Sequence, residues 1–134
     1  ACSAASAGGI FYVMGGVDVP RFNASTFRDS LHQPWVFEEK CRPEYFDPTT
    51  NKWRFMPPVS RPYTHAAAAA MGGLIYVFGG LSFGSVMDQV QLFNPLRESW
   101  ECLEPMPTPR FECAAASTNG KIYVIGGANL SGEP

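Results

Sequence analysis

The chain has 134 residues, the length of one ordinary domain, with a formal net charge of −2 and a pI of about 5.6. That charge argues against nucleic acid and anionic membranes as partners, and no apolar run approaches the roughly 18 residues of a membrane-spanning helix. Its 13 glycines and 12 prolines, without sustained helical periodicity, favour short strands joined by tight turns.

The cysteines predict neither a metal site nor a disulfide framework, because none of them has C-x-x-C spacing. We expect free thiols in a reducing compartment and therefore a cytoplasmic protein. Sequons at Asn23 and Asn129 would matter only in a secreted protein. The four cysteines are Cys2, Cys41, Cys102 and Cys113.

A β-branched and aromatic run that ends in two glycines occurs three times, and each copy predicts a buried strand followed by a tight turn. The three copies are Gly9–Gly16, Gly73–Gly80 and Gly120–Gly127. The last two glycine pairs are 47 residues apart, whereas the first two are 64 apart, which is 17 more. The extra 17 residues must fall in the first unit, within 17–42.

Four strands are expected in each complete unit. The run before the glycines is the second strand, the third ends at Asp47-Pro48 or Asn94-Pro95, and the fourth begins at Trp53 or Trp100. The first strands consist of small residues at Cys2–Ser6, His65–Ala70 and Glu112–Ser117.

The alanine run in the second of these first strands has high helix propensity. We nevertheless predict a strand there, because the run aligns with Cys113–Ser117 and precedes a Gly-Gly turn. Small side chains suit strands that converge on a common axis.

Four-stranded units of this length around one axis predict an all-β fold, a β-propeller with two four-stranded blades plus half of a third. The expected units are residues 1–57 with the insertion at 17–42, residues 63–104, and residues 111–127. An open array would expose strand edges and blade faces. We therefore expect either a piece of a larger propeller or self-association with other copies.

The glycine pair after Ile-Tyr-Val, the Tyr/Phe-Asp/Asn-Pro turn, the Trp six residues later and the Met-Pro that follows together resemble the kelch repeat. The resemblance implies a closed ring of about six blades. In kelch repeats an Arg commonly stands sixteen residues before the first glycine, where this chain has Arg110 in one unit and Tyr63 in the preceding one. Residues that recur in register are expected to hold the blades together: Tyr12, Gly15, Gly16, Trp53, Tyr76, Gly79, Gly80, Trp100, Tyr123, Gly126 and Gly127.

Because strands in a blade alternate in direction, the insertion, the loop 81–88 and the linking segments 57–64 and 105–111 are expected at one end of the propeller. Aromatic and arginine side chains on such loops are typical of interfaces. Alternatively, the insertion's aromatic residues fold back onto the blade, Arg110 joins blades through backbone carbonyls, and His65 is a packed histidine. The candidate partner-binding residues are Arg21, Phe22, Phe27, Arg28, His32, Trp35, Arg61, Tyr63 and Arg110.

No catalytic residues, cofactor or enzymatic activity are expected, because the chain has two histidines and no nucleophile motif. The resemblance implies a protein–protein interaction module that binds a protein or peptide on its loops. Its leading form is the substrate-recognition propeller of a BTB-kelch adaptor, in which an N-terminal region contacts the cullin of a RING ubiquitin ligase. The alternative is an actin-binding, cytoskeleton-associated kelch protein, and a remote one is a kelch-type copper oxidase.

Overall fold

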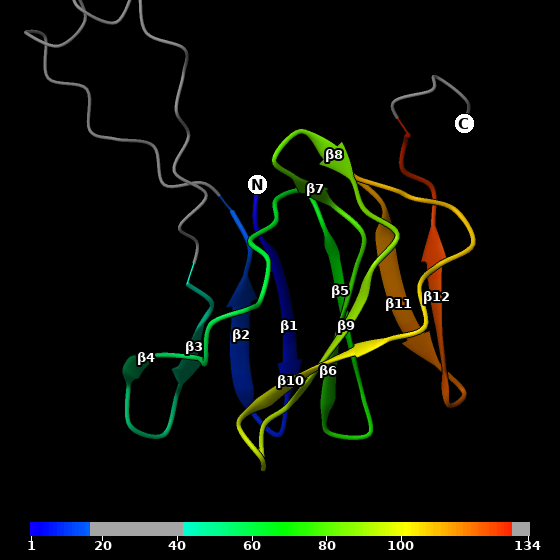
Figure 1. Cartoon of the computed structure of the whole chain (residues 1–134). Coiled ribbons are helices and arrows are strands. Elements are labelled where there is room, and N and C mark those ends of the chain that lie inside the picture. The colour runs from blue at the N-terminus through cyan, green and yellow to red at the C-terminus, as the bar shows by residue number, and fades with distance from the viewer. Residues whose placement is uncertain (17–41, 130–134) are drawn as a thin grey trace, which may run out of the picture.

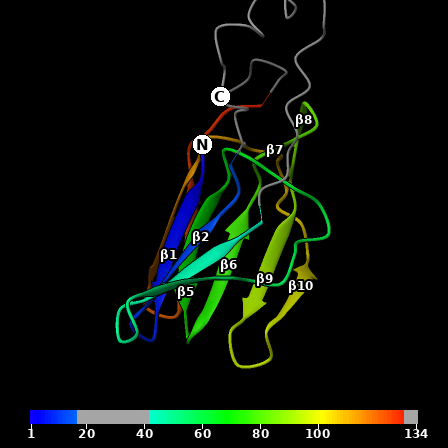
Figure 2. The same ribbon diagram turned by 90° about the vertical axis from the view of Figure 1, so that its left-hand side faces the viewer.

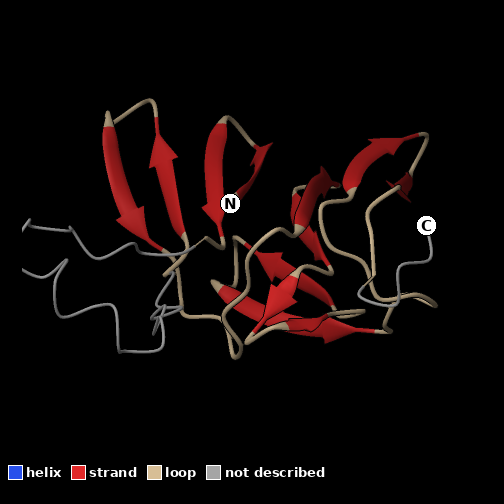
Figure 3. Cartoon of the chain, turned by 90° about the horizontal axis from the view of Figure 1, so that it is seen from above, coloured by secondary structure: helices blue, strands red, loops and turns tan. Residues whose placement is uncertain are grey.

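The computed structural model describes residues 1–16 and 42–129, and every regular element in these ranges is a β-strand (Figure 1). The strands form two four-stranded sheets and two two-stranded sheets. Seen from above, the sheets are arranged as a fan (Figure 3). None of the described segments is a helix long and apolar enough to cross a membrane.

The first sheet, blade 1, is antiparallel with the strand order β1-β2-β3-β4. The strands β2 and β3 pair although the insertion separates them in sequence, with Tyr12 opposite Tyr45. Its strands are β1 (Ser3–Ala7), β2 (Ile10–Met14), β3 (Glu44–Asp47) and β4 (Lys52–Phe55).

Blade 2 repeats this order as β5-β6-β9-β10, and Figure 2 shows these strands side by side from the inner to the outer edge. They are β5 (Ala67–Met71), β6 (Leu74–Phe78), β9 (Val90–Asn94) and β10 (Ser99–Leu103). Blade 3 consists of the hairpin β11 (Ala114–Thr118) and β12 (Lys121–Ile125). The predicted fold of two four-stranded blades and half of a third is confirmed.

The polar residues before the two outer turns close the hairpins as expected. The Asp47 carboxylate accepts hydrogen bonds from the backbone N–H and the hydroxyl of Thr49, at 2.8 and 2.6 Å. In blade 2 the amide oxygen of Asn94 accepts from the backbone N–H of Leu96 at 3.0 Å. Both side chains therefore form Asx turns, the local bonding that makes Asp and Asn frequent in turns.

Two expectations about strand bounds differ from the structure. The innermost strands β5 and β11 begin two residues later than expected, because His65 and Glu112 have left-handed backbones with φ of 54° and 55° that interrupt the extended chain. The segment 81–88 is not a plain loop, since it contains the short hairpin of β7 (Leu81–Ser82) and β8 (Ser85–Val86). The alanine run does form a strand, as predicted.

The core lies between the sheets. From blade 1, Tyr12 and Met14 pack with Ile75, Val77 and Phe93 of blade 2, and all five side chains are buried. Burying a large apolar side chain contributes about 1.5–3 kcal/mol, so the packing of these five side chains stabilises blade 1 against blade 2.

Blade 2 lies between the other two blades, because its inner strand β5 contacts both β1 and β11. The outward face of blade 3 repeats the positions of Tyr12 and Met14, yet Tyr123 and Ile125 are 48% and 66% exposed there. Residues that are buried between blades are therefore exposed on the last one.

Candidate interaction face

Three connections between strands meet at one end of the blades, the upper end in Figure 1. We call the segments 57–64, 81–88 and 105–111 the loop face. Thr64 and Leu81 exchange backbone hydrogen bonds of 2.8 and 2.7 Å, and Arg110 donates its backbone N–H to the carbonyl of Met87 at 3.0 Å. Met106 donates in the same way to Asp88. Backbone bonds thus join all three segments into one surface.

The glycine pairs connect this surface to the blades. The second glycine of each of the first two pairs donates its N–H to the carbonyl of the segment that enters the next blade, Gly16 to Tyr63 at 3.1 Å and Gly80 to Arg110 at 2.7 Å. A Cβ atom on Gly79 would clash with the same Arg110 carbonyl. The close approach of two backbones therefore requires glycine at this position.

Arg110 is half-buried and contacts two blades. Its backbone bonds to Gly80 and Met87 of blade 2, while its guanidinium donates through Nη1 to the carbonyl oxygen of Gly126 at 2.8 Å. These bonds agree with the alternative interpretation of the sequence, in which Arg110 joins blades through backbone carbonyls and does not contact a partner.

Tyr63 does not lie on the surface. Its side chain is 3% exposed, belongs to the core between blades 1 and 2, and lies against Gly15. The expectation that it contacts a partner directly therefore needs correction. An aromatic ring at this repeat position packs against the preceding blade, whereas the longer Arg110 side chain reaches a carbonyl.

Arg61 is exposed on the loop face. Its Nε donates to the hydroxyl of Ser82 at 3.1 Å, and that hydroxyl donates to the carbonyl of Pro62 at 2.7 Å. Ser82 is fully buried, so it fixes the guanidinium at the base of the β7–β8 hairpin. Within residues 1–16 and 42–129, no carboxylate pairs with Arg61.

His65 stands where blades 2 and 3 meet. Its Nδ1 lies 2.9 Å from the hydroxyl of Thr64 and its Nε2 lies 3.9 Å from a carboxylate oxygen of Glu112. The backbone of Glu112 also donates to the His65 carbonyl at 2.9 Å. These contacts are those of a histidine that packs between blades.

The described residues contain no group of three or more His, Cys, Asp and Glu side chains able to hold a metal ion. Near this junction, burial raises the pKa of the Cys113 thiol, and that effect outweighs the opposing influence of Arg110. A raised thiol pKa makes the thiolate scarcer and Cys113 less nucleophilic.

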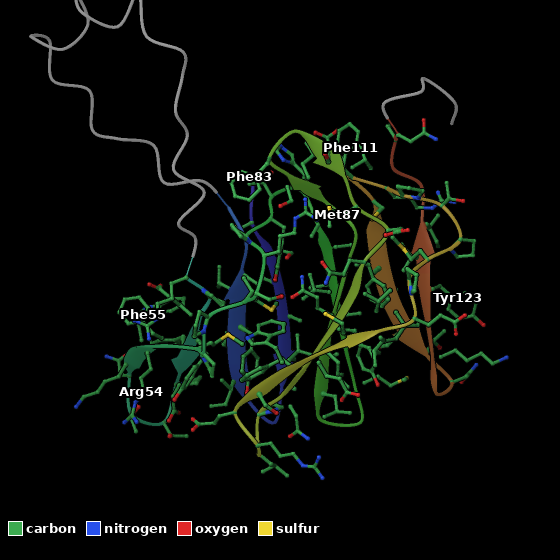
Figure 4. All side chains as sticks on the ribbon, in the orientation of Figure 1. Arg54, Phe55, Phe83, Met87, Phe111 and Tyr123 are labelled. Atoms are coloured by element: carbon green, nitrogen blue, oxygen red, sulfur yellow. The ribbon has the colours of Figure 1, made fainter. Side chains whose placement is uncertain are left out.

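The candidates from the insertion fall outside the residues that the structure describes: Arg21, Phe22, Phe27, Arg28, His32 and Trp35. One exposed residue on the loop face is not among the sequence-based candidates. Phe83, at the tip of the β7–β8 hairpin, is 68% exposed (Figure 4). The sequence carries little signal for this turn, because two-residue hairpin turns favour pairs such as Asn-Gly, Asp-Gly or Gly-Gly, and Phe-Gly is none of these.

A shallow hollow of about 400 Å³ lies at the opposite end, between the turns of blades 1 and 2. Tyr12 contributes to its lining, and no charged side chain does. Burial, with a smaller contribution from Tyr45, raises the pKa of the Tyr12 phenol, which therefore stays protonated.

Comparison with protein families matches the Kelch motif over residues 62–107, about a third of the chain. That match supports the resemblance of this chain to the kelch-repeat family. Comparison with curated protein sequences finds no match. Among solved structures, the structure of YjhT superposes with a TM-score of 0.73 at 23% sequence identity, over 97% of this chain and 34% of that one.

The chain therefore spans about a third of the length of YjhT, and at this identity the likeness concerns the fold. The match over residues 62–107 includes the four main strands of blade 2. The fold is a kelch-type β-propeller fold, of which this chain forms two four-stranded blades and the first half of a third.

Proposed function

We propose that this chain is a protein-interaction module, not an enzyme, that binds a protein or peptide partner on its loop face. The observation that carries the proposal is the loop face itself, where three segments are joined by backbone hydrogen bonds and Arg61 is exposed. A surface held in one conformation loses little entropy on binding, which favours recognition. Kelch domains generally bind proteins, which agrees with this role.

Our finer proposal is the substrate-recognition propeller of a BTB-kelch adaptor for a cullin-RING ubiquitin ligase, located in the cytoplasm. The Kelch motif match supports the propeller part of this proposal. The described cysteines support the location, since Cys2, Cys102 and Cys113 are free thiols. Contact with the cullin would belong to a region N-terminal to these blades in the full-length protein.

The loop face is tested by capture with a charge-reversed variant. The immobilised chain is cross-linked to cytosolic proteins, which are identified by mass spectrometry, and Arg61→Glu is compared with the wild type. We expect Arg61→Glu to reduce recovery of the specific partner about tenfold, since a cation at an interface centre is often worth more than 1 kcal/mol. Arg97→Glu is the matched control, because Arg97 is also an exposed arginine and lies in the turn at the opposite end.

Equal recovery with both variants would contradict the loop face as the binding surface. The full-length protein then separates the adaptor role from the cytoskeletal one. Co-purification with a cullin supports the adaptor, whereas co-sedimentation with filamentous actin without a cullin supports the cytoskeletal alternative.

A further inference from the structure

Phe83 has a backbone conformation that is unusual for an aromatic residue. Residues 1–16 and 42–129 contain four two-residue hairpin turns in which both residues have positive φ, the type I′ pattern that prefers Gly and Asn. Phe83, with φ of 48°, is the first residue of one such turn. The other three are Gly8-Gly9, Gly72-Gly73 and Asn119-Gly120.

Burial does not explain a phenylalanine at this position. The ring is 68% exposed at the hairpin tip, in a conformation that sterics disfavour for a bulky side chain. Asn119 shows that the same turn forms in this chain with a small polar residue. Neither turn preference nor core packing therefore accounts for Phe83, and residues that local rules do not explain are concentrated at functional sites.

The hairpin that carries Phe83 is held firmly at its base. Leu81 exchanges two backbone hydrogen bonds with Thr64, and Ser82 is fully buried with its hydroxyl bonded to Pro62 and Arg61. These bonds fix the backbone next to the ring before any partner arrives. A preorganised aromatic side chain in an exposed position is what interface hot spots use.

The chemistry beside the ring indicates the kind of partner. The Arg61 guanidinium is bonded to Ser82, the residue next to Phe83, and a guanidinium fork matches a carboxylate. We infer that Phe83 and Arg61 together bind a peptide segment of another protein that carries a large apolar side chain close to an Asp or Glu. This inference rests on the proposed function and names its contact residues.

The test uses a displayed library of random linear peptides, selected on the immobilised 134-residue chain. We expect selected peptides to combine an aromatic or leucine residue with a nearby Asp or Glu. Phe83→Asn should weaken their binding about tenfold or more, measured by fluorescence polarisation, because truncating a hot-spot residue has this effect. Arg61→Gln should act in the same direction.

Leu96→Asn is the matched control, since Leu96 is 97% exposed in a turn at the opposite end. It should leave peptide binding unchanged. Phe83→Asn should also leave the melting temperature unchanged or raise it, because Asn suits the left-handed turn position. Binding and stability should therefore not fall together, as they would if the ring only supported the fold.

Three other outcomes of these experiments would contradict the inference. Selected peptides that bind the wild type and Phe83→Asn equally would overturn this inference and leave the proposed function standing. A melting temperature that falls with Phe83→Asn would also overturn it, because the ring would then be part of the packing. Failure to select any peptide would count against the proposed function as well as this inference.

Discussion

The backbone N–H of Gly80 donates to the carbonyl oxygen of Arg110 at 2.7 Å, and this bond crosses from blade 2 to the segment that enters blade 3. The bond from Gly16 to Tyr63 is its equivalent one blade earlier. The glycine pairs thus connect consecutive blades, and they do so beside the surface proposed to bind partners.

Replacing the first glycine of a pair should reduce the free energy of unfolding most where the segment that enters the next blade lies close to that glycine. Gly79→Ala should destabilise the chain by about 3 kcal/mol, from a left-handed backbone and a clash with the Arg110 carbonyl. Gly126→Ala should cost about 1 kcal/mol, since φ is similar and a Cβ would meet nothing within 4 Å. Urea denaturation measures both, and equal losses would refute a steric role for Gly79.

The two repeated tryptophans should differ in their contribution to stability. Trp100 donates its indole N–H to the carbonyl of Pro57 in the preceding segment at 2.9 Å, whereas Trp53 is 56% exposed. Trp100→Phe should lower the free energy of unfolding by about 1–2 kcal/mol through the lost bond. Trp53→Phe should change it by less than about 0.5 kcal/mol. Thermal or urea melts compare the pair, and a larger loss at Trp53 would be inconsistent with this arrangement.

The turn at Asp47 should make stability depend on acid pH. Hydrogen bonds from Thr49 lower the pKa of the Asp47 carboxyl below its ordinary value of 3.8, so folding favours the ionised form. The resulting stabilisation is present above pH 3.8 and is lost as the pH falls through the lowered folded-state pKa.

Asp47→Asn should remove this dependence and keep the turn, because Asn94 forms the same turn in blade 2. Melting temperatures of the two chains between neutral pH and about pH 2 measure the effect. The wild type should lose its advantage over Asp47→Asn in acid. A constant difference across that range would contradict the assignment.

The exposed face of blade 3 should cause self-association. Tyr123 and Ile125 repeat positions that are buried between blades 1 and 2, and Phe11 on the opposite outer blade is 54% exposed. We expect light scattering to detect more than one copy per particle. Changing Tyr123 and Ile125 together to Lys should weaken association at least about tenfold, because two large apolar side chains would no longer be buried.

Leu96→Lys, at the exposed turn of blade 2, serves as the control and should leave association unchanged. A monomeric wild type with a sharp melt would rule out association through these faces.

Much of the fold could be predicted from the spacing of repeated residues. Glycine pairs, Asx-Pro turns and tryptophans in register indicate the strands and blades, because each copy has the same packing to satisfy. Hydrophobic periodicity does not reveal left-handed residues such as His65 and Glu112, so the bounds expected from the sequence begin β5 and β11 two residues too early. The strands β7 and β8, with two residues each, are too short to show any periodicity.

The residues of the loop face are less predictable from the sequence than the strands, because they are the ones that do not repeat. Tyr63 and Arg110 share a repeat position, yet one is buried and the other bonds to a carbonyl of the next blade. The size and polarity of each side chain determine where it lies, and an alignment of the repeats does not show this. Phe83 stands out only when its turn is compared with the three other two-residue turns in the part of the chain that the structure describes.

Both ends of the long insertion in blade 1 are anchored to the scaffold. Gly16 bonds to Tyr63, and the carbonyl of Pro43 accepts the N–H of Met56 at 2.8 Å. Doubling the length of a flexible loop between fixed ends costs only about 0.6 kcal/mol. Sequences of different length and chemistry can therefore be exchanged between these two anchors during evolution or by engineering, so the blade can acquire a new specificity while its stability is preserved.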